Sequence, residues 1–217
     1  MCYSVMVKQD ISYLSKRYGA LVRESEFAQL TEKHQLNPKS YKYLPRIYPG
    51  YFSPVVAAQD GKPQVFPMRY RIRPSGSPTE VPSKYNMFNA RLDALNVRPT
   101  WKALLGRRHG IVLVEKFFEW VEDATTLKKK VISFSPSKQA YLQVPILWDY
   151  WTDGLDVIRS FALITDDPPP EVLQAGHDRS PICLSDEGVI KWLSQRSPMQ
   201  ALNLRIDEFF IAADSTP

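Results

Sequence analysis

The stretch GIVLVEKFFEWVE, residues 110–122, is the strongest strand signal in the sequence. Its β-branched and aromatic residues favour an extended backbone. Further runs of strand length follow at residues 129–134, 141–151 and 160–165. Earlier in the chain, CYSVMV at residues 2–7 reads as a short strand, and residues 55–66 read as two strands joined by a turn at Asp60-Gly61. Strands therefore dominate the predicted fold.

Helices are predicted around these strands without regular alternation. Asp10 is a candidate cap for a helix that places Leu14, Tyr18, Leu21, Val22 and Phe27 on or near one face. A short helix is predicted from Pro99 to near Gly106, and Ser185 is a candidate cap for a third. The pattern predicts an α+β fold with a mainly antiparallel, barrel-like sheet core and flanking helices. We expect residues 1–217 to form a single domain.

Composition limits the functional classes. The net charge is +5 over 217 residues, a mild basic excess that permits a polyanionic partner. No dinucleotide-binding, P-loop, HExxH or paired CxxC motif is present, so we expect no cofactor and no metal. The chain has two cysteines, no apolar core of a signal peptide and no membrane-spanning run. We expect a cytoplasmic monomer that does not contact a membrane.

Cys2 follows the initiator methionine directly. Removal of Met1 would leave an amine and a thiol on adjacent carbons, and both groups are partly nucleophilic near neutral pH. Such a 1,2-aminothiol condenses with an aldehyde to a five-membered thiazolidine. Alternatively, Cys2 is a small apolar residue packed in an edge strand.

Glu119 and His177 are candidate acid–base groups. On the strand at 110–122, Glu119 shares a face with Phe117 and Val121, so its carboxylate is either an acid–base group among apolar neighbours or one end of a structural ion pair. His177 lies in AGHDRSP, flanked by Asp178 and Arg179. It is either a general acid–base group or a loop histidine bonded to nearby backbone.

Candidate binding residues lie in two extended segments. In NAR, Asn89 and Arg91 share a strand face, where the amide can orient another group and the guanidinium can bind phosphate. In MRYRIRP, Arg69, Arg71 and Arg73 form a row of cations on one face. The row suits the phosphates of a single nucleic-acid strand, or it marks a solvated edge strand protected by charge.

Four motifs together resemble one known family. They are Cys2, NAR at 89–91, FFEW at 117–120 and HDRSP at 177–181, in this order. The set is similar to that of the SRAP family, the SOS-response-associated peptidases or abasic-site-processing proteins. The resemblance implies a protein that binds single-stranded DNA and captures the aldehyde of an abasic site in a thiazolidine crosslink, with removal of its own leader residue.

The same resemblance implies roles for individual residues. Cys2 would be the nucleophile, and Asn89 would help to position it. Glu119 and His177 would transfer protons during imine formation, opening of the sugar ring and reversal of the crosslink. Arg91 would contact a phosphate, and no cofactor is implied.

The sequence departs from the family pattern in its DNA-contact regions. Members usually begin Cys-Gly-Arg-Phe, whereas Tyr3-Ser4-Val5 follows Cys2 here. A usual Trp-Gly pair is replaced by Tyr70-Arg71, and residues 74–83 contain no tryptophan. Two rival functions stay open, namely an N-terminal-cysteine amidohydrolase or peptidase and a non-catalytic module that binds single-stranded nucleic acid.

Overall fold

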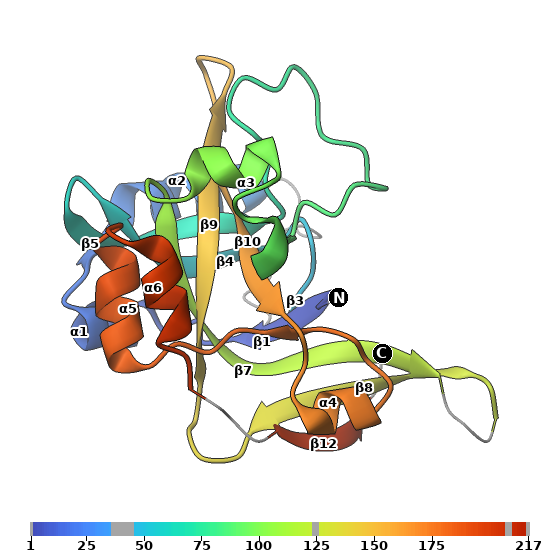
Figure 1. Ribbon diagram of the computed structural model, residues 1–217. Helices are drawn as coiled ribbons and strands as arrows, with labels where there is room; N and C mark the ends of the chain where they lie inside the picture. Colours follow the sequence, from blue (N-terminus) through green and yellow to red (C-terminus); the bar gives the residue numbers. More distant parts are fainter. Residues whose placement is uncertain (1, 36–45, 123–125, 207–209, 216–217) are drawn as a thin grey trace.

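The computed structural model describes residues 2–35, 46–122, 126–206 and 210–215 (Figure 1). Its strands are β1 Ser4–Val7, β2 Leu21–Val22, β3 Arg46–Ile47, β4 Phe52–Gln59, β5 Lys62–Tyr70, β6 Asn89–Arg91, β7 His109–Glu122, β8 Lys129–Pro136, β9 Leu142–Thr152, β10 Val157–Asp166, β11 Ser180–Pro181 and β12 Phe210–Ser215. Its helices are α1 Ile11–Tyr18, α2 Glu24–Gln35, α3 Pro99–Leu104, α4 Pro170–Gln174, α5 Asp186–Leu193 and α6 Pro198–Asn203, with one 3₁₀ turn at Leu92–Ala94.

A closed barrel of five strands forms the centre of the fold. These five strands form a closed ring, in which β10 pairs with β5, β5 with β4, β4 with β7, β7 with β9, and β9 with β10. Three pairings are parallel, those of β10 with β5, β10 with β6 and β2 with β5, and the other pairings of described strands are antiparallel. The predicted α+β fold with a mainly antiparallel barrel is therefore confirmed.

Strand β7, which contains the stretch at residues 110–122, organises the fold. Its first half, from His109 to Val114, is fully buried and pairs with β9 and β4 inside the barrel. Its second half leaves the barrel and pairs with β1 and β8 (Figure 1). Gly110 is required where the strands approach closely, because a Cβ there would lie 2.8 Å from the Val56 carbonyl oxygen.

One predicted helix is two helices in the structure. Asp10 caps α1 as expected, accepting a hydrogen bond of 2.9 Å from the Tyr13 backbone N–H. The helix ends at Tyr18 because Gly19 adopts the left-handed conformation, with φ of 58°, and its N–H bonds back to Ser15. Leu21 and Val22 then form β2 beside β5, and Leu21 is exposed. The prediction that they continue the apolar face of the first helix is wrong.

His109 is a structural residue of the core. Its ring is fully buried and stacks on Trp192 with centroids 3.6 Å apart. Nε2 accepts a hydrogen bond from the Gly106 N–H at 2.8 Å, so Nδ1 carries the proton and donates to the Trp192 carbonyl at 2.8 Å. The imidazole is therefore neutral, and burial lowers its pKa from 6.5 to about 4.

Acid should destabilise the protein through this histidine. An unfolded chain binds a proton at His109 below pH 6.5, whereas the folded chain resists it until about pH 4. The free energy of unfolding should therefore fall by up to about 3 kcal/mol across this window. Urea unfolding at pH 7 and pH 4.5 measures the change. His109→Gln should show a smaller loss, and an equal loss in both proteins would contradict the assignment.

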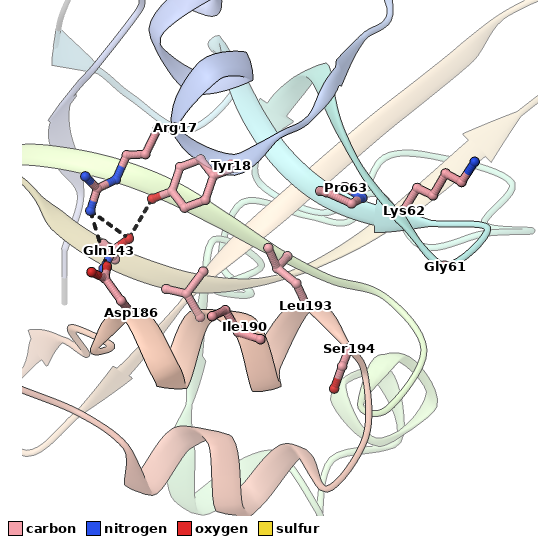
Figure 2. A pocket seen from close by; sticks show the side chains of 11 residues that line it. Arg17, Tyr18, Gly61, Lys62, Pro63, Gln143, Asp186, Ile190, Leu193 and Ser194 are labelled. Carbon is pink, nitrogen blue, oxygen red and sulfur yellow. Dashed lines mark hydrogen bonds and ion pairs between the residues drawn. The ribbon is translucent and has the colours of Figure 1, made fainter.

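Helices α1 and α5 face each other across a hollow of about 470 Å³ that no candidate site residue lines (Figure 2). At one end, the Gln143 Oε1 atom accepts from the Tyr18 hydroxyl at 2.8 Å and from Arg17 at 3.3 Å. The Gln143 Nε2 atom donates to Asp186 at 2.8 Å. These polar groups are satisfied by one another, so the network joins α1, β9 and α5 as a structural contact. None of the helices in the described part of the chain is long and apolar enough to cross a membrane.

Candidate active site

Cys2 lies in the buried core beside the second half of β7. Its side chain is 0% exposed and belongs to the same apolar cluster as Tyr70 and Phe117. Pairing of β1 with β7, in which Ser4 lies opposite Phe118, brings the start of the chain alongside the part of β7 that carries Glu119. The packing alternative for Cys2 thus describes its surroundings correctly, but the thiol also has polar partners.

Two side chains hold the Cys2 carbonyl. The Tyr70 hydroxyl donates to this oxygen at 2.8 Å, and the Asn89 amide Nδ2 donates to it at 3.1 Å. Tyr70 lies at the end of β5 and Asn89 at the start of β6, so the two residues reach Cys2 from both ends of the connecting segment. The paired bonds fix the backbone of residue 2, from which both its amine and its thiol project.

Glu119 connects the thiol to a histidine. The Glu119 carboxylate raises the pKa of the Cys2 thiol by its charge and by hydrogen bonding, and Glu119 Oε2 lies 3.0 Å from His177 Nε2. The carboxylate is almost fully buried, with 2% of the side chain exposed, whereas His177 is 11% exposed. The structure therefore brings Cys2, Asn89, Glu119 and His177 together, although they are far apart in sequence.

The hydrogen bonds define where protons lie. His177 Nδ1 lies 3.0 Å from the Arg179 carbonyl oxygen, which only accepts, so Nδ1 carries a hydrogen. The contact between Nε2 and Glu119 then holds one proton, on either the ring or the carboxyl group. Glu119 thus acts on the thiol on one side and contacts the imidazole on the other, an arrangement that suits a proton relay.

The thiol is protonated at neutral pH. Burial raises the pKa of Cys2 well above 9.0, and the charge and hydrogen bond of Glu119 raise it further. Tyr70 responds in the same way, since burial and the nearby Cys2 and Glu119 raise its pKa well above 10.0. The arrangement therefore suits a thiol that gives up its proton to Glu119 as it reacts, more than a standing thiolate.

The predicted phosphate-binding residue Arg91 lies on the exposed side of β6. It pairs with Asp93, and its side chain is 45% exposed. Arg179, bonded to Asp167, lines the same small hollow of about 50 Å³. Because the Arg179 carbonyl also holds His177, the two guanidiniums lie on the His177 side of the site.

Arg69, Arg71 and Arg73 face away from the thiol. Their guanidiniums gather around Glu80, and each side chain is less than 20% exposed. Tyr70 alternates with them and points to the opposite, buried face, where it reaches Cys2. The alternation in MRYRIRP indicates that Tyr70 faces away from the arginines. Its contact with Cys2 was not predicted from the sequence.

An aromatic surface lies next to Cys2. Tyr3 is 48% exposed, and its ring lies 5.9 Å from Phe88 and 6.0 Å from Tyr48 in edge-to-face contacts. Arg46 Nε donates to Ser4 Oγ at 3.1 Å, and its guanidinium lies 3.8 Å from the centre of the Phe118 ring. Arg46, on β3, thus places a guanidinium next to Ser4.

Solved structures with a similar fold are distant from this chain in sequence. A solved structure of a protein from Bacteroides thetaiotaomicron superposes with a TM-score of 0.75 at 18% identity, covering 98% of this chain and 91% of that one. A phage-related protein from Bordetella bronchiseptica gives a TM-score of 0.67 at 18% identity, covering 100% and 95%. These likenesses establish the fold alone.

Curated relatives share part of their length with the chain. The abasic site processing protein YobE of Bacillus subtilis is 27% identical over 115 residues, which are 52% of this chain and 51% of YobE. The abasic site processing protein HMCES of Pongo abelii is 26% identical over 171 residues, which are 64% of this chain and 48% of HMCES. The chain thus spans about half the length of the curated relatives it matches.

The model of the SOS response associated peptidase (SRAP) family matches residues 1–209, nearly the whole chain. It covers the thiol at Cys2, the amide at Asn89 and the Glu119–His177 pair, which the fold brings into one site. The protein therefore belongs to the SRAP family.

Proposed function

We propose that this protein binds abasic sites in single-stranded DNA and forms a thiazolidine crosslink through Cys2. The observation that carries the proposal is the Glu119 carboxylate, which lies 3.0 Å from the His177 imidazole and raises the pKa of the Cys2 thiol. Both abasic-site-processing relatives named above support the same substrate. The chemistry requires removal of Met1, which lies outside the described residues.

The proposed reaction proceeds in two steps. The Cys2 amine attacks C1′ of the ring-opened sugar, and loss of one water gives an imine. The sulfur then adds to C1′ as the C=N bond becomes a single bond, and the thiol proton ends on the nitrogen. Glu119 would accept the thiol proton, and His177 would protonate the departing hydroxyl group. Tyr70 and Asn89 would keep amine and thiol on the same side of the aldehyde carbon.

The raised pKa of the thiol favours this reaction over amide hydrolysis. A cysteine amidohydrolase is activated by lowering the pKa of its thiol. Burial and Glu119 act in the opposite direction on Cys2. In thiazolidine formation the amine reacts first, so a protonated thiol is a suitable second nucleophile.

A denaturing gel tests the proposal. Protein whose intact mass shows loss of Met1 is mixed with single-stranded DNA that carries one abasic site. A slower, covalent band should appear, and the same strand with an intact base should give none. The absence of a band from Met1-free protein would overturn the proposed function, and an acyl-enzyme with amide substrates would favour the peptidase alternative.

A further inference from the structure

Glu80 lies in a socket formed by three arginines. Its carboxylate makes two hydrogen bonds with Arg69, at 2.7 and 3.2 Å, and lies 3.6 Å from Arg73 and 3.9 Å from Arg71. The exposed fractions of the arginine side chains are 14%, 19% and 12% in sequence order, against 41% for Glu80. Three guanidinium groups thus surround the Glu80 carboxylate, which lies in an exposed segment.

The three arginines offer more hydrogen-bond donors than the Glu80 carboxylate uses. The Nε atoms of Arg69 and Arg73 are buried and have no hydrogen-bond partner. Burial would raise the pKa of Glu80, but the hydrogen bond and charge of Arg69, with the charges of Arg73 and Arg71, lower it. Glu80 is therefore a carboxylate anion held in an excess of positive charge.

A carboxylate and a phosphodiester present the same features to arginine. Each carries one negative charge on two oxygens that accept a bidentate guanidinium. We propose that the three-arginine socket is a binding site for a backbone phosphate of the nucleic-acid strand, and that Glu80 occupies it in cis until the strand displaces it. This inference rests on the proposed function, because it assumes that the strand crosses this face.

The segment that carries Glu80 is connected to the thiol site. It begins after Tyr70 and ends at Phe88 and Asn89, and Tyr70 and Asn89 both hold the Cys2 carbonyl. Between these anchors it projects outward as a long connection between β5 and β6 (Figure 1). Release of Glu80 would therefore free the middle of a segment whose two ends position Cys2.

Other contacts also hold the segment, among them a hydrogen bond from the Arg71 guanidinium to the Val81 carbonyl and one from the Arg73 backbone N–H to Ser160 Oγ. The Trp151 indole N–H donates to the Ser77 carbonyl at 2.8 Å, and the Ser75 N–H donates to Asp149 at 2.9 Å. Arg73 stacks on the Trp151 ring, with 3.3 Å between the guanidinium carbon and the ring centre. Trp151 would stay in place to hold Arg73 after Glu80 leaves, so the socket keeps its shape for a phosphate.

Removal of the carboxylate charge tests the proposal. Fluorescence anisotropy with a labelled oligothymidylate that lacks abasic sites should show about tenfold tighter binding for Glu80→Gln than for the unaltered protein. The slope of log K against log salt should stay nearly the same, because one phosphate fills the socket in both proteins and the variant only avoids the displacement of Glu80. Glu187→Gln on α5 makes the same change in net charge away from the segment, and should bind with almost unchanged affinity.

Equal or weaker binding by a folded Glu80→Gln would overturn the proposal, as would an equal gain in Glu187→Gln. A measurement on the unaltered protein covers the case in which the variant unfolds. Hydrogen–deuterium exchange of peptides within residues 74–83 should become faster when the oligothymidylate binds. Unchanged or slower exchange would show that Glu80 stays in the socket.

The same proteins separate this inference from the proposed function. An abasic strand that crosslinks to the unaltered protein, with no gain in affinity for Glu80→Gln, would leave the proposed function standing and remove the socket as a phosphate site. A gain in affinity without any crosslink would keep the socket and remove the abasic-site chemistry.

Discussion

Cys2→Ala is expected to abolish the stable crosslink to an abasic strand. The variant keeps an N-terminal amine after Met1 removal, so it can still form an imine, but it lacks the sulfur that closes the ring. The imine hydrolyses during denaturing electrophoresis, and the crosslinked band should fall to background. Borohydride added during the reaction should restore a band by reducing the imine, which shows that the substrate still binds.

The fold should survive this substitution. Cys2 is fully buried, and replacing its sulfur by hydrogen removes one small apolar group at a cost of about 1 kcal/mol. Cys183→Ala is the matched control, because Cys183 is the second cysteine of the sequence and is also buried. It should crosslink at the normal rate. A stable band that persists in Cys2→Ala, or that disappears in Cys183→Ala, would contradict the assignment of the nucleophile.

Glu119→Gln is expected to slow crosslink formation by about 10²–10⁴-fold, the usual contribution of a positioned acid–base group. The amide keeps the size of the side chain but cannot accept the thiol proton. Single-turnover rates with an excess of protein measure the effect. Glu122→Gln, on the same strand but exposed and paired opposite Lys129, is the control and should react at the normal rate.

The thiol itself provides a readout that a purely structural role would not change. Glu119 raises the pKa of Cys2 by its charge and hydrogen bond, in addition to the larger effect of burial. Glu119→Gln should therefore lower the pKa of the thiol, measured as the pH dependence of the Cβ chemical shift of labelled cysteine. Cys183→Ala identifies the signal of Cys2. An unchanged titration would show that Glu119 does not act on the thiol.

Local sequence patterns predicted the strands and the faces of the key side chains. The alternation in FFEW placed Glu119 with Phe117 and Val121, and all three are buried on β7. The turn at Asp60-Gly61 was also predictable, because both residues adopt positive φ, of 54° and 73°. Such features depend on neighbours within a few residues, which the sequence displays directly.

Contacts between distant segments could not be predicted in this way. Glu80 is an ordinary acidic residue in a polar segment, and only the folded chain shows that it faces Arg69, Arg71 and Arg73. The arginine row was expected to be open to DNA phosphates, and that role stays a proposal. The prediction of one helix that continues through Leu21 was wrong for a related reason. Pairing of β2 with β5 outweighs the helical spacing of the apolar residues.

The mass and location of the covalent product test most directly whether Cys2 forms a thiazolidine with an abasic site. Met1-free protein is allowed to react with a short abasic strand, treated with borohydride, and analysed by intact mass and peptide mapping. We expect an adduct on the N-terminal peptide at Cys2, one water lighter than the sum of its parts and unchanged by borohydride, because a thiazolidine has no C=N bond to reduce. An adduct that gains two hydrogens, or one located on a lysine, would contradict it.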